Sequence, residues 1–240
     1  MIPLNLYKTE LHCHTKEASA CGKETPESVV EKYIEAGYTT LVITNHMCTT
    51  TFMSDWYADY LKSTCSEDSW QTKVDFYIRD YKKAVAAAKG RINVILGIEL
   101  RFDKESINDY LIYGATEEWL RSSEKIRDMK VKEFYPYAKE TGVLIYHAHP
   151  LRNGMMVVKP DYLDGYEVYN GNLGKDNRND LVEVWAERYN KPGISGSDYH
   201  SELHVIGAGI VTDFPITSND MLLEVLKTNN YKLIKGGDIV

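Results

Sequence analysis

Short apolar runs alternate with longer amphipathic segments along most of the chain. Runs with the length and the β-branched or aromatic content of strands are Tyr7–His14, Thr39–Asn45, Ile92–Leu100, Asp109–Tyr113, Val143–His147, Tyr166–Tyr169, Gly193–Ser195 and Gly207–Val211. Between them, helix-start and helix-stop residues recur, as in the Thr25-Pro26-Glu27 start of one segment and its Gly37 stop. Helices are therefore predicted over Pro26–Ala36, Val74–Lys89, Ser123–Thr141, Asn179–Asn190 and Ser218–Thr228.

This alternation predicts an α/β fold in which crossover helices connect parallel strands. Seven or eight such units in 240 residues favour a closed or nearly closed barrel, with an open doubly wound sheet as the alternative. No repeat or linker divides the chain, so residues 1–240 are expected to form a single domain. The segment Met47–Lys73 interrupts the alternation and is predicted to be a long loop, either a functional lid or a plain surface excursion.

Composition narrows the expected partners and compartment. Lys and Arg number 28 against 35 Asp and Glu, and the resulting net charge of −7 makes nucleic acid and anionic membrane unlikely partners. No run reaches the ~18 apolar residues of a membrane helix, and the N-terminus MIPLNLYKTE does not have the pattern of a secretory signal. The four cysteines form no CxxC pair, so we expect reduced thiols in a cytoplasmic protein.

Six of the seven histidines lie at or just beyond the ends of predicted strands. Three pairs have the i, i+2 spacing that places two side chains on one face of a strand: His12 with His14, His147 with His149, and Asp198 with His200. His46 ends another run, and Glu99 lies near the end of a further one. Because strand ends converge on one rim of a barrel, these imidazoles and carboxylates predict a site for two or three Zn, Mn or Fe ions.

The pieces ELHCHT, ITNH, GIEL, HAHP and GSDYH, in this order, resemble the motifs of the PHP (polymerase and histidinol phosphatase) family of metal-dependent phosphoesterases. LDGYEVYNGN resembles the family's strand and asparagine-glycine turn, and the resemblance spans roughly residues 8 to 211. It implies a distorted (β/α)7-type, TIM-like barrel as a single domain. It also implies one ion among His12, His14, Glu99 and Asp198, a second shared by Glu99 and held by His149, and a third position with His46 and His200.

The chain departs from the family's pattern at three places. Glu10 stands where the family often has Asp, and we expect it to support the ligands from behind. Cys21 stands in the segment where the family places a His or Asp ligand, so it is either a thiolate ligand or a structural cysteine. Near DYLIYG the chain offers Tyr113 and Gly114 in place of a further histidine. The second site is then one ligand short, or His147 completes it, and two ions are a safer expectation than three.

Such a cluster would generate hydroxide and neutralise phosphoryl oxygens. Asp198, His200 and His147 are the candidates for passing a proton to the leaving group, without a choice among them. Arg152 follows the HAHP motif and suits a phosphate because its donors engage two oxygens at once. Arg178 is a second candidate, with a surface ion pair as the alternative for each arginine. Asn170 either binds substrate or only forms its turn.

The favoured function is hydrolysis of a small phosphomonoester, similar to histidinol phosphatase. A phosphodiesterase or exonuclease is an alternative, which the acidic charge balance disfavours. Amide hydrolysis is another, because the same hydroxide can attack a carbonyl. A metal-binding module without catalysis is the remaining alternative, since two motif positions lack the family's ligand.

Overall fold

The computed structural model describes residues 6–105 and 107–240. Residues 1–5, which belong to the N-terminal segment judged not to be a secretory signal, lie outside the described residues. One sheet contains β1 (Tyr7–Glu10), β2 (Tyr38–Ile43), β4 (Asn93–Leu96), β10 (Gly209–Thr212), β11 (Lys232–Lys235) and β12 (Asp238–Ile239). The other contains β3 (His46–Met47), β5 (Ile98–Arg101), β6 (Asp109–Tyr113), β7 (Leu144–His147), β8 (Gly165–Asn170) and β9 (Gly193–Gly196). Their orders are β12-β11-β10-β1-β2-β4 and β3-β5-β6-β7-β8-β9.

The sheets are mixed, which corrects the expectation of parallel strands throughout. β1 with β2, β2 with β4, β7 with β8 and β8 with β9 pair in parallel, whereas β6 is antiparallel to both of its neighbours. The connection from β5 to β6, residues 102–108, is too short for a crossover helix, so the chain has to return in the opposite direction. The start of β6 therefore lies beside the end of β5.

The strands form two separate ladders, so backbone pairing does not resolve a closed barrel, although an isolated parallel bridge joins Cys13, after β1, to Tyr199, after β9. The chain crosses from one sheet to the other at Gly97, between β4 and β5. On the far side, the hydroxyl of Ser195 in β9 donates to the carbonyl of Ile234 and accepts from the amide of Gly209. The two sheets thus face each other around a common interior, and the fold remains α/β.

Apolar side chains from both sheets fill this interior. Leu11, Val42, Tyr146 and Ile210 are buried in one cluster, which also contains the Leu226 side chain of a C-terminal helix. A second cluster packs helices against the outer face of the β5–β8 region, and a third packs them against β1 and β2. The alternation of inward and outward side chains along each strand therefore decides which residues can reach the interior.

The helices are α1 (Pro26–Glu35), α2 (Thr49–Phe52), α3 (Asp55–Thr64), α4 (Trp70–Ala88), α5 (Glu117–Ser122), α6 (Val131–Thr141), α7 (Asn179–Arg188) and α8 (Asn219–Thr228), with 3-10 turns at Ile126–Asp128 and Pro160–Tyr162. Side-chain caps start several of them, such as Thr25 on α1 and Ser69 on α4. No helix of the described residues is long and apolar enough to cross a membrane. All four cysteines are free thiols.

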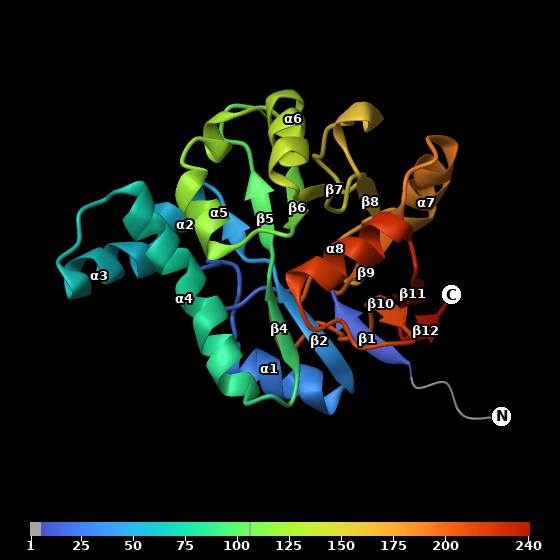
Figure 1. Cartoon of the computed structure of the whole chain (residues 1–240), viewed down its shortest axis with the longest axis horizontal. Helices are drawn as coiled ribbons and strands as arrows, with labels where there is room; N and C mark the ends of the chain where they lie inside the picture. The colour runs from blue at the N-terminus through green and yellow to red at the C-terminus, as the bar shows by residue number, and fades with distance from the viewer. Residues whose placement is uncertain (1–5, 106) are drawn as a thin grey trace.

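Two helical predictions need correction. The segment 47–73 is not a continuous loop, because it contains α2, α3 and the start of α4, and α3 projects from the edge of the molecule (Figure 1). Ser54 caps α3, and Tyr57 is its buried contact with the body of the protein. The predicted helix over 123–141 is divided into a 3-10 turn and α6, while α5 was missed before it.

Candidate metal centre

Four buried side chains from three segments converge at one rim: His12 and His14 follow β1, Asp198 follows β9, and Glu99 is the second residue of β5. The Nε2 atoms of His12 and His14 are 3.1 Å apart. Asp198 Oδ1 lies 3.3 and 3.4 Å from them, and Glu99 Oε2 lies 3.4 and 3.1 Å from them. A tetrahedral ion with bonds of about 2.0–2.2 Å requires ligand atoms separated by about 3.3–3.6 Å. His12, His14 and Asp198 thus form one ligand group, and Glu99 Oε2 lies close enough to both histidines to contribute to the same transition-metal ion.

The second carboxylate oxygen of Glu99 faces another set of ligands. Glu99 Oε1 lies 3.1 Å from Nε2 of His149, and His12, Glu99 and His149 offer ligand atoms within 4.8 Å of one another. Glu99, His46 and Asp109 form a further such group. One carboxylate thus contributes to neighbouring groups through different oxygens, as in a bridging ligand.

Sequence analysis missed Asp109, although it is the first residue of the DYLIYG run. Had this strand been parallel, its other end, near Tyr113 and Gly114, would lie at the rim. In the antiparallel β6, the beginning of the strand lies at the rim, where Asp109 pairs in register with Arg101 of β5. The signal that could have revealed it is the short connection, residues 102–108, which cannot hold the crossover that a parallel strand needs.

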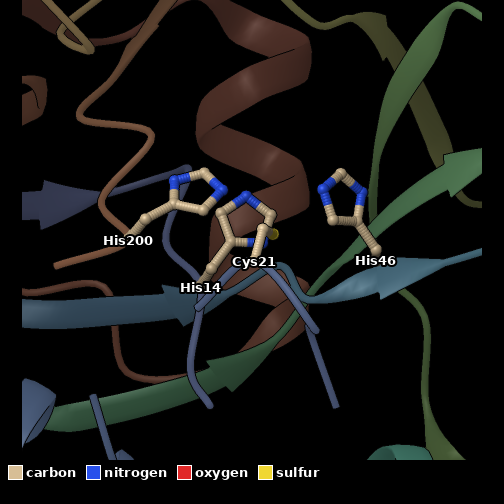
Figure 2. Close-up of side chains that lie close together, drawn as sticks. All are labelled: His14, Cys21, His46 and His200. Atoms are coloured by element: carbon tan, nitrogen blue, oxygen red, sulfur yellow. The ribbon is translucent and has the colours of Figure 1, made fainter. Parts of the chain in front are cut away.

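Cys21 belongs to a fourth group, with His14, His46 and His200, and Figure 2 shows these four side chains close together. The His14 ring centroid is 4.2 Å from that of His200 and 4.7 Å from that of His46. Burial lowers the pKa of His46 to about 3 and that of His200 to about 4, so both rings are neutral and can donate a lone pair. Burial raises the pKa of the Cys21 thiol to about 12, so a bound cation would have to stabilise its thiolate.

A second layer of hydrogen bonds orients these ligands. Glu167, which is fully buried, accepts from Nδ1 of His12 at 2.8 Å through Oε1 and from the backbone amide of His149 at 2.8 Å through Oε2. The Ser19 hydroxyl lies 3.1 Å from Nδ1 of His14 and accepts from the backbone amide of His46. Both contacts leave the Nε2 atoms of His12 and His14 facing the cluster, as metal ligands require.

Backbone geometry at the site is constrained. His149 has φ of 31° and Asp198 has φ of 49°, both in the left-handed region that non-glycine residues rarely adopt. Gly196, just before the turn that carries Asp198, has no room for a side chain: a Cβ there would lie 2.4 Å from Cβ of His12 and 2.7 Å from Oε1 of Glu167. Strained backbone torsions and close packing therefore accompany the inward orientation of these ligands.

The electrostatics suit a cation. Burial by itself lowers the pKa of His12, but the carboxylates of Glu167, Asp198 and Glu99 raise it well above its usual value. The same negative charge that stabilises a proton on the buried imidazole would also stabilise a divalent cation. In addition, Glu99 Oε2 is buried and, among the described residues, accepts no well-formed hydrogen bond. An unsatisfied buried oxygen of this kind calls for a partner such as a metal ion, so these residues fit the ions that the sequence predicts.

His147 lies apart from this cluster. Its strand β7 alternates, so that Tyr146 faces the interior while Ile145 and His147 face the outer helices, and the His147 ring stacks on Tyr110 at 5.2 Å. None of the ligand groups among the described residues includes it. The i, i+2 spacing with His149 does not bring the pair together, because the left-handed turn at His149 ends the strand alternation.

A cavity of about 520 Å³ opens over the cluster and is lined by Arg152, by Arg101 and by several of the ligand residues. Arg152 donates through Nη2 to Oδ2 of Asp198 at 2.6 Å and to Oδ1 of Asn170 at 3.1 Å. Asn170 is fully buried behind this arginine and does not line the cavity. Arg178 also lies away from it, donating to the carbonyl of Leu151.

The comparisons with known proteins agree with this geometry. A family model described as the PHP domain matches residues 10–210, which is most of the chain. The chain belongs to the PHP domain family. A search of curated proteins found no match for this PHP domain.

Solved structures share its fold at low sequence identity. One, from Bifidobacterium adolescentis, is provisionally described as a metal-dependent phosphoesterase; it is 17% identical with a TM-score of 0.54, over 92% of this chain and 96% of that one. PsfC from Pseudomonas syringae is 14% identical with a TM-score of 0.57, over 92% and 88%. An amidohydrolase from Chromobacterium violaceum, solved with sulfate and no metal, is 15% identical with a TM-score of 0.53, over 96% and 99%.

Proposed function

We propose that this PHP domain is a metal-dependent hydrolase of phosphate esters and that it acts on small phosphomonoesters. The observation that carries the proposal is the position of Glu99, whose two oxygens face different ligand groups, which supports a site for more than one ion. Imidazole and carboxylate donors favour Zn, Mn or Fe. His12, His14, Glu99 and Asp198 would hold one ion, and Glu99 with His149 a second, to which Asp109, from the adjoining group with His46 and Glu99, would contribute.

Bound divalent ions would acidify a water molecule and neutralise phosphoryl oxygens. The residues of the chain have the other roles. Arg152 is held on Asp198 and Asn170, so its guanidinium is oriented before substrate arrives and can donate to a phosphoryl oxygen from the cavity wall. His200 also lines the cavity, and its Nδ1 donates to the carbonyl of Asp198 at 2.8 Å, which leaves the lone pair of Nε2 to accept a proton from a water molecule.

A third ion would require Cys21. His14, His46 and His200 supply three nitrogens around it, and a thiolate in the fourth place favours a soft ion such as Zn over Mn. We therefore propose two ions as the working centre, and a third position whose occupancy depends on the metal supplied.

The test is phosphate release from a panel of histidinol phosphate, sugar phosphates and nucleoside monophosphates, with added Mn or Zn and with a chelator. Release that the chelator abolishes is expected. Asp198→Asn should reduce kcat/KM by about 100-fold or more, because it removes a ligand charge and the anchor of Arg152. Asp80→Asn changes another buried aspartate, outside the ligand groups, and is the control. A folded, metal-loaded protein that releases no phosphate from any ester would overturn the proposal.

Amide hydrolysis is the second candidate, since one structure with this fold is described as an amidohydrolase. The same ions could polarise a carbonyl as well as a phosphoryl group. The phosphate panel is therefore run beside N-acyl amino acids and cyclic amides. Chelator-sensitive turnover of amides alone would replace the first proposal by the second.

A further inference from the structure

Arg101 is a cation at the centre that neither the motifs nor the ligand groups account for. It is the last residue of β5, two positions after Glu99, so both side chains leave the strand on the same face. Its Nε and Nη2 donate to the two oxygens of Asp109 at 2.8 and 2.7 Å. About a third of the side chain is exposed, 34%. Arg101 is therefore fixed at one edge and accessible at the other.

The accessible edge is free to bind a ligand. A guanidinium presents two forks, and the contact with Asp109 uses the Nε–Nη2 fork. Within the described residues, no hydrogen bond uses Nη1 of Arg101. The ion pair thus holds the side chain rigid without consuming its second fork, which is the arrangement that lowers the entropy cost of binding an anion.

Arg101 also stands at the junction of three hollows. It lines the cavity over the metal ligands, which Arg152 also lines. It lines a second hollow of about 400 Å³ with Cys21 and Thr50, and a third of about 490 Å³ with Thr49. Arg152 lines the first hollow but neither of the other two. A molecule held at Arg152 that extends into the second or third hollow therefore passes Arg101.

The charge around the cavity exceeds what one phosphoryl group requires. Arg101, Arg152 and Lys175 line it, against Asp176 and the ligand carboxylates. Two divalent ions would balance the four carboxylates of the lining, Glu99, Asp109, Asp176 and Asp198, and the three side-chain cations then exceed the negative charge of one phosphate monoester. Such a concentration of positive charge in a protein of net charge −7 favours a ligand with more than one anionic group.

We propose that Arg101 binds a second anionic group of the substrate, so that the site selects phosphate esters carrying another phosphate or a carboxylate on a short carbon skeleton. This inference rests on the proposed function, because the phosphoryl group at the ions defines the first anion. Arg101 is then the residue that determines specificity, while Arg152 engages the phosphoryl group that is transferred.

The experiment compares three phosphonates that cannot be hydrolysed, so it does not depend on turnover. Propylphosphonate carries one anionic group, 3-phosphonopropionate replaces its methyl group by a carboxylate, and ethane-1,2-bisphosphonate replaces it by a second phosphonate. Binding to the Mn-loaded protein is measured by titration calorimetry. At least one of the two-anion probes should bind about 10-fold or more tightly than propylphosphonate, as one charge-assisted contact allows. The stronger of the two identifies the second group.

Arg101→Gln should reduce that preference to less than about 3-fold and leave propylphosphonate binding unchanged, while Arg178→Gln, outside the cavity, should keep the preference. Because Arg101 also holds Asp109, metal content is measured in each variant. If Arg101→Gln loses ions, Arg101→Lys is used, since its single amino group can remain on Asp109 and leaves no second fork. The preference must then disappear with the ions retained.

Equal binding of all three probes by the wild-type protein would overturn the inference, as would a preference that survives in both Arg101 variants. Loss of all three probes together with the ions, in both variants, would show that Arg101 acts only through Asp109, which also overturns it. Failure of the proposed function looks different: no ester is hydrolysed, whatever the phosphonates do.

Discussion

Replacing Glu167 by Gln tests whether the ligands depend on the carboxylate behind them. Every group that faces Glu167 is a donor: Nδ1 of His12 at Oε1, and the backbone amide of His149 with the side-chain amide of Asn170 at Oε2. A glutamine must turn its NH2 toward one of these. If the NH2 faces His12, Nδ1 has to accept, and the proton moves to Nε2, which then cannot bind metal. If it faces the other side, it opposes two donors.

The magnitude follows from these contacts. Removing an outer partner of a metal-binding histidine typically costs 10–100-fold in metal affinity, or about 1.4–2.7 kcal/mol. His12 belongs to the group with His14 and Asp198 and also to the group with Glu99 and His149. Glu167→Gln should therefore weaken both ions, and not only one of them.

Glu10→Gln is the matched control. Glu10 is also fully buried, but its Oε1 accepts from the backbone amides of His12 and Ser197, and its Oε2 from the Tyr33 hydroxyl, which can equally act as an acceptor. A glutamine satisfies all of these contacts. Affinities for Zn and Mn are measured by competition with a chromophoric chelator. Wild-type affinity in Glu167→Gln, or an equal loss in Glu10→Gln, would refute the assignment.

Three further predictions concern the ligands and their surroundings. Asp109→Asn should lower the bound metal, measured by mass spectrometry, by about one ion per chain while the His12–His14 ion remains; unchanged stoichiometry would exclude Asp109 as a ligand. Cys21→Ser should abolish thiolate-to-Co(II) charge-transfer absorption in the Co-substituted protein, and its persistence would rule out Cys21. Burial raises the pKa of Asp80 to about 6 from 3.8. The folded protein favours the protonated form of this carboxyl. The contribution of Asp80 to the free energy of unfolding is therefore fully present below its unfolded pKa, near pH 4, and is lost as the pH rises through 6. Relative to wild type, Asp80→Asn should gain about 3 kcal/mol of unfolding free energy between pH 4 and pH 8 in chelator; a constant difference would contradict this.

The histidines and acids of the motifs could be placed from the sequence because their position depends on local geometry. His12 and His14 share one face of an extended segment, and their side chains do meet. Glu99 lies in a strand whose apolar residues can only lie in a core. The fold class followed in the same way, from strands and helices of alternating period that bury one face each.

Tertiary structure decided what depends on strand direction and on backbone torsion. The same i, i+2 spacing does not bring His147 and His149 to one site, because the left-handed backbone at His149 ends the alternation of side chains along the strand. Asp109 lies at the rim because β6 runs antiparallel, and the short connection after Arg101 forces that direction only once β5 is placed in a sheet. Whether the sheets close is likewise a matter of contacts between β9, β10 and β11, which lie far apart from β4 and β5 in sequence.

The roles of the arginines show the same division. Arg152 follows a motif and could be selected from its position in the chain, but its orientation comes from Asp198 and Asn170, which reach it from other strands. Arg101 carries no motif, and its sequence neighbours predict only the end of a strand. A local pattern therefore determines which residues can bind a metal or an anion, while long-range packing determines which of them share one cavity.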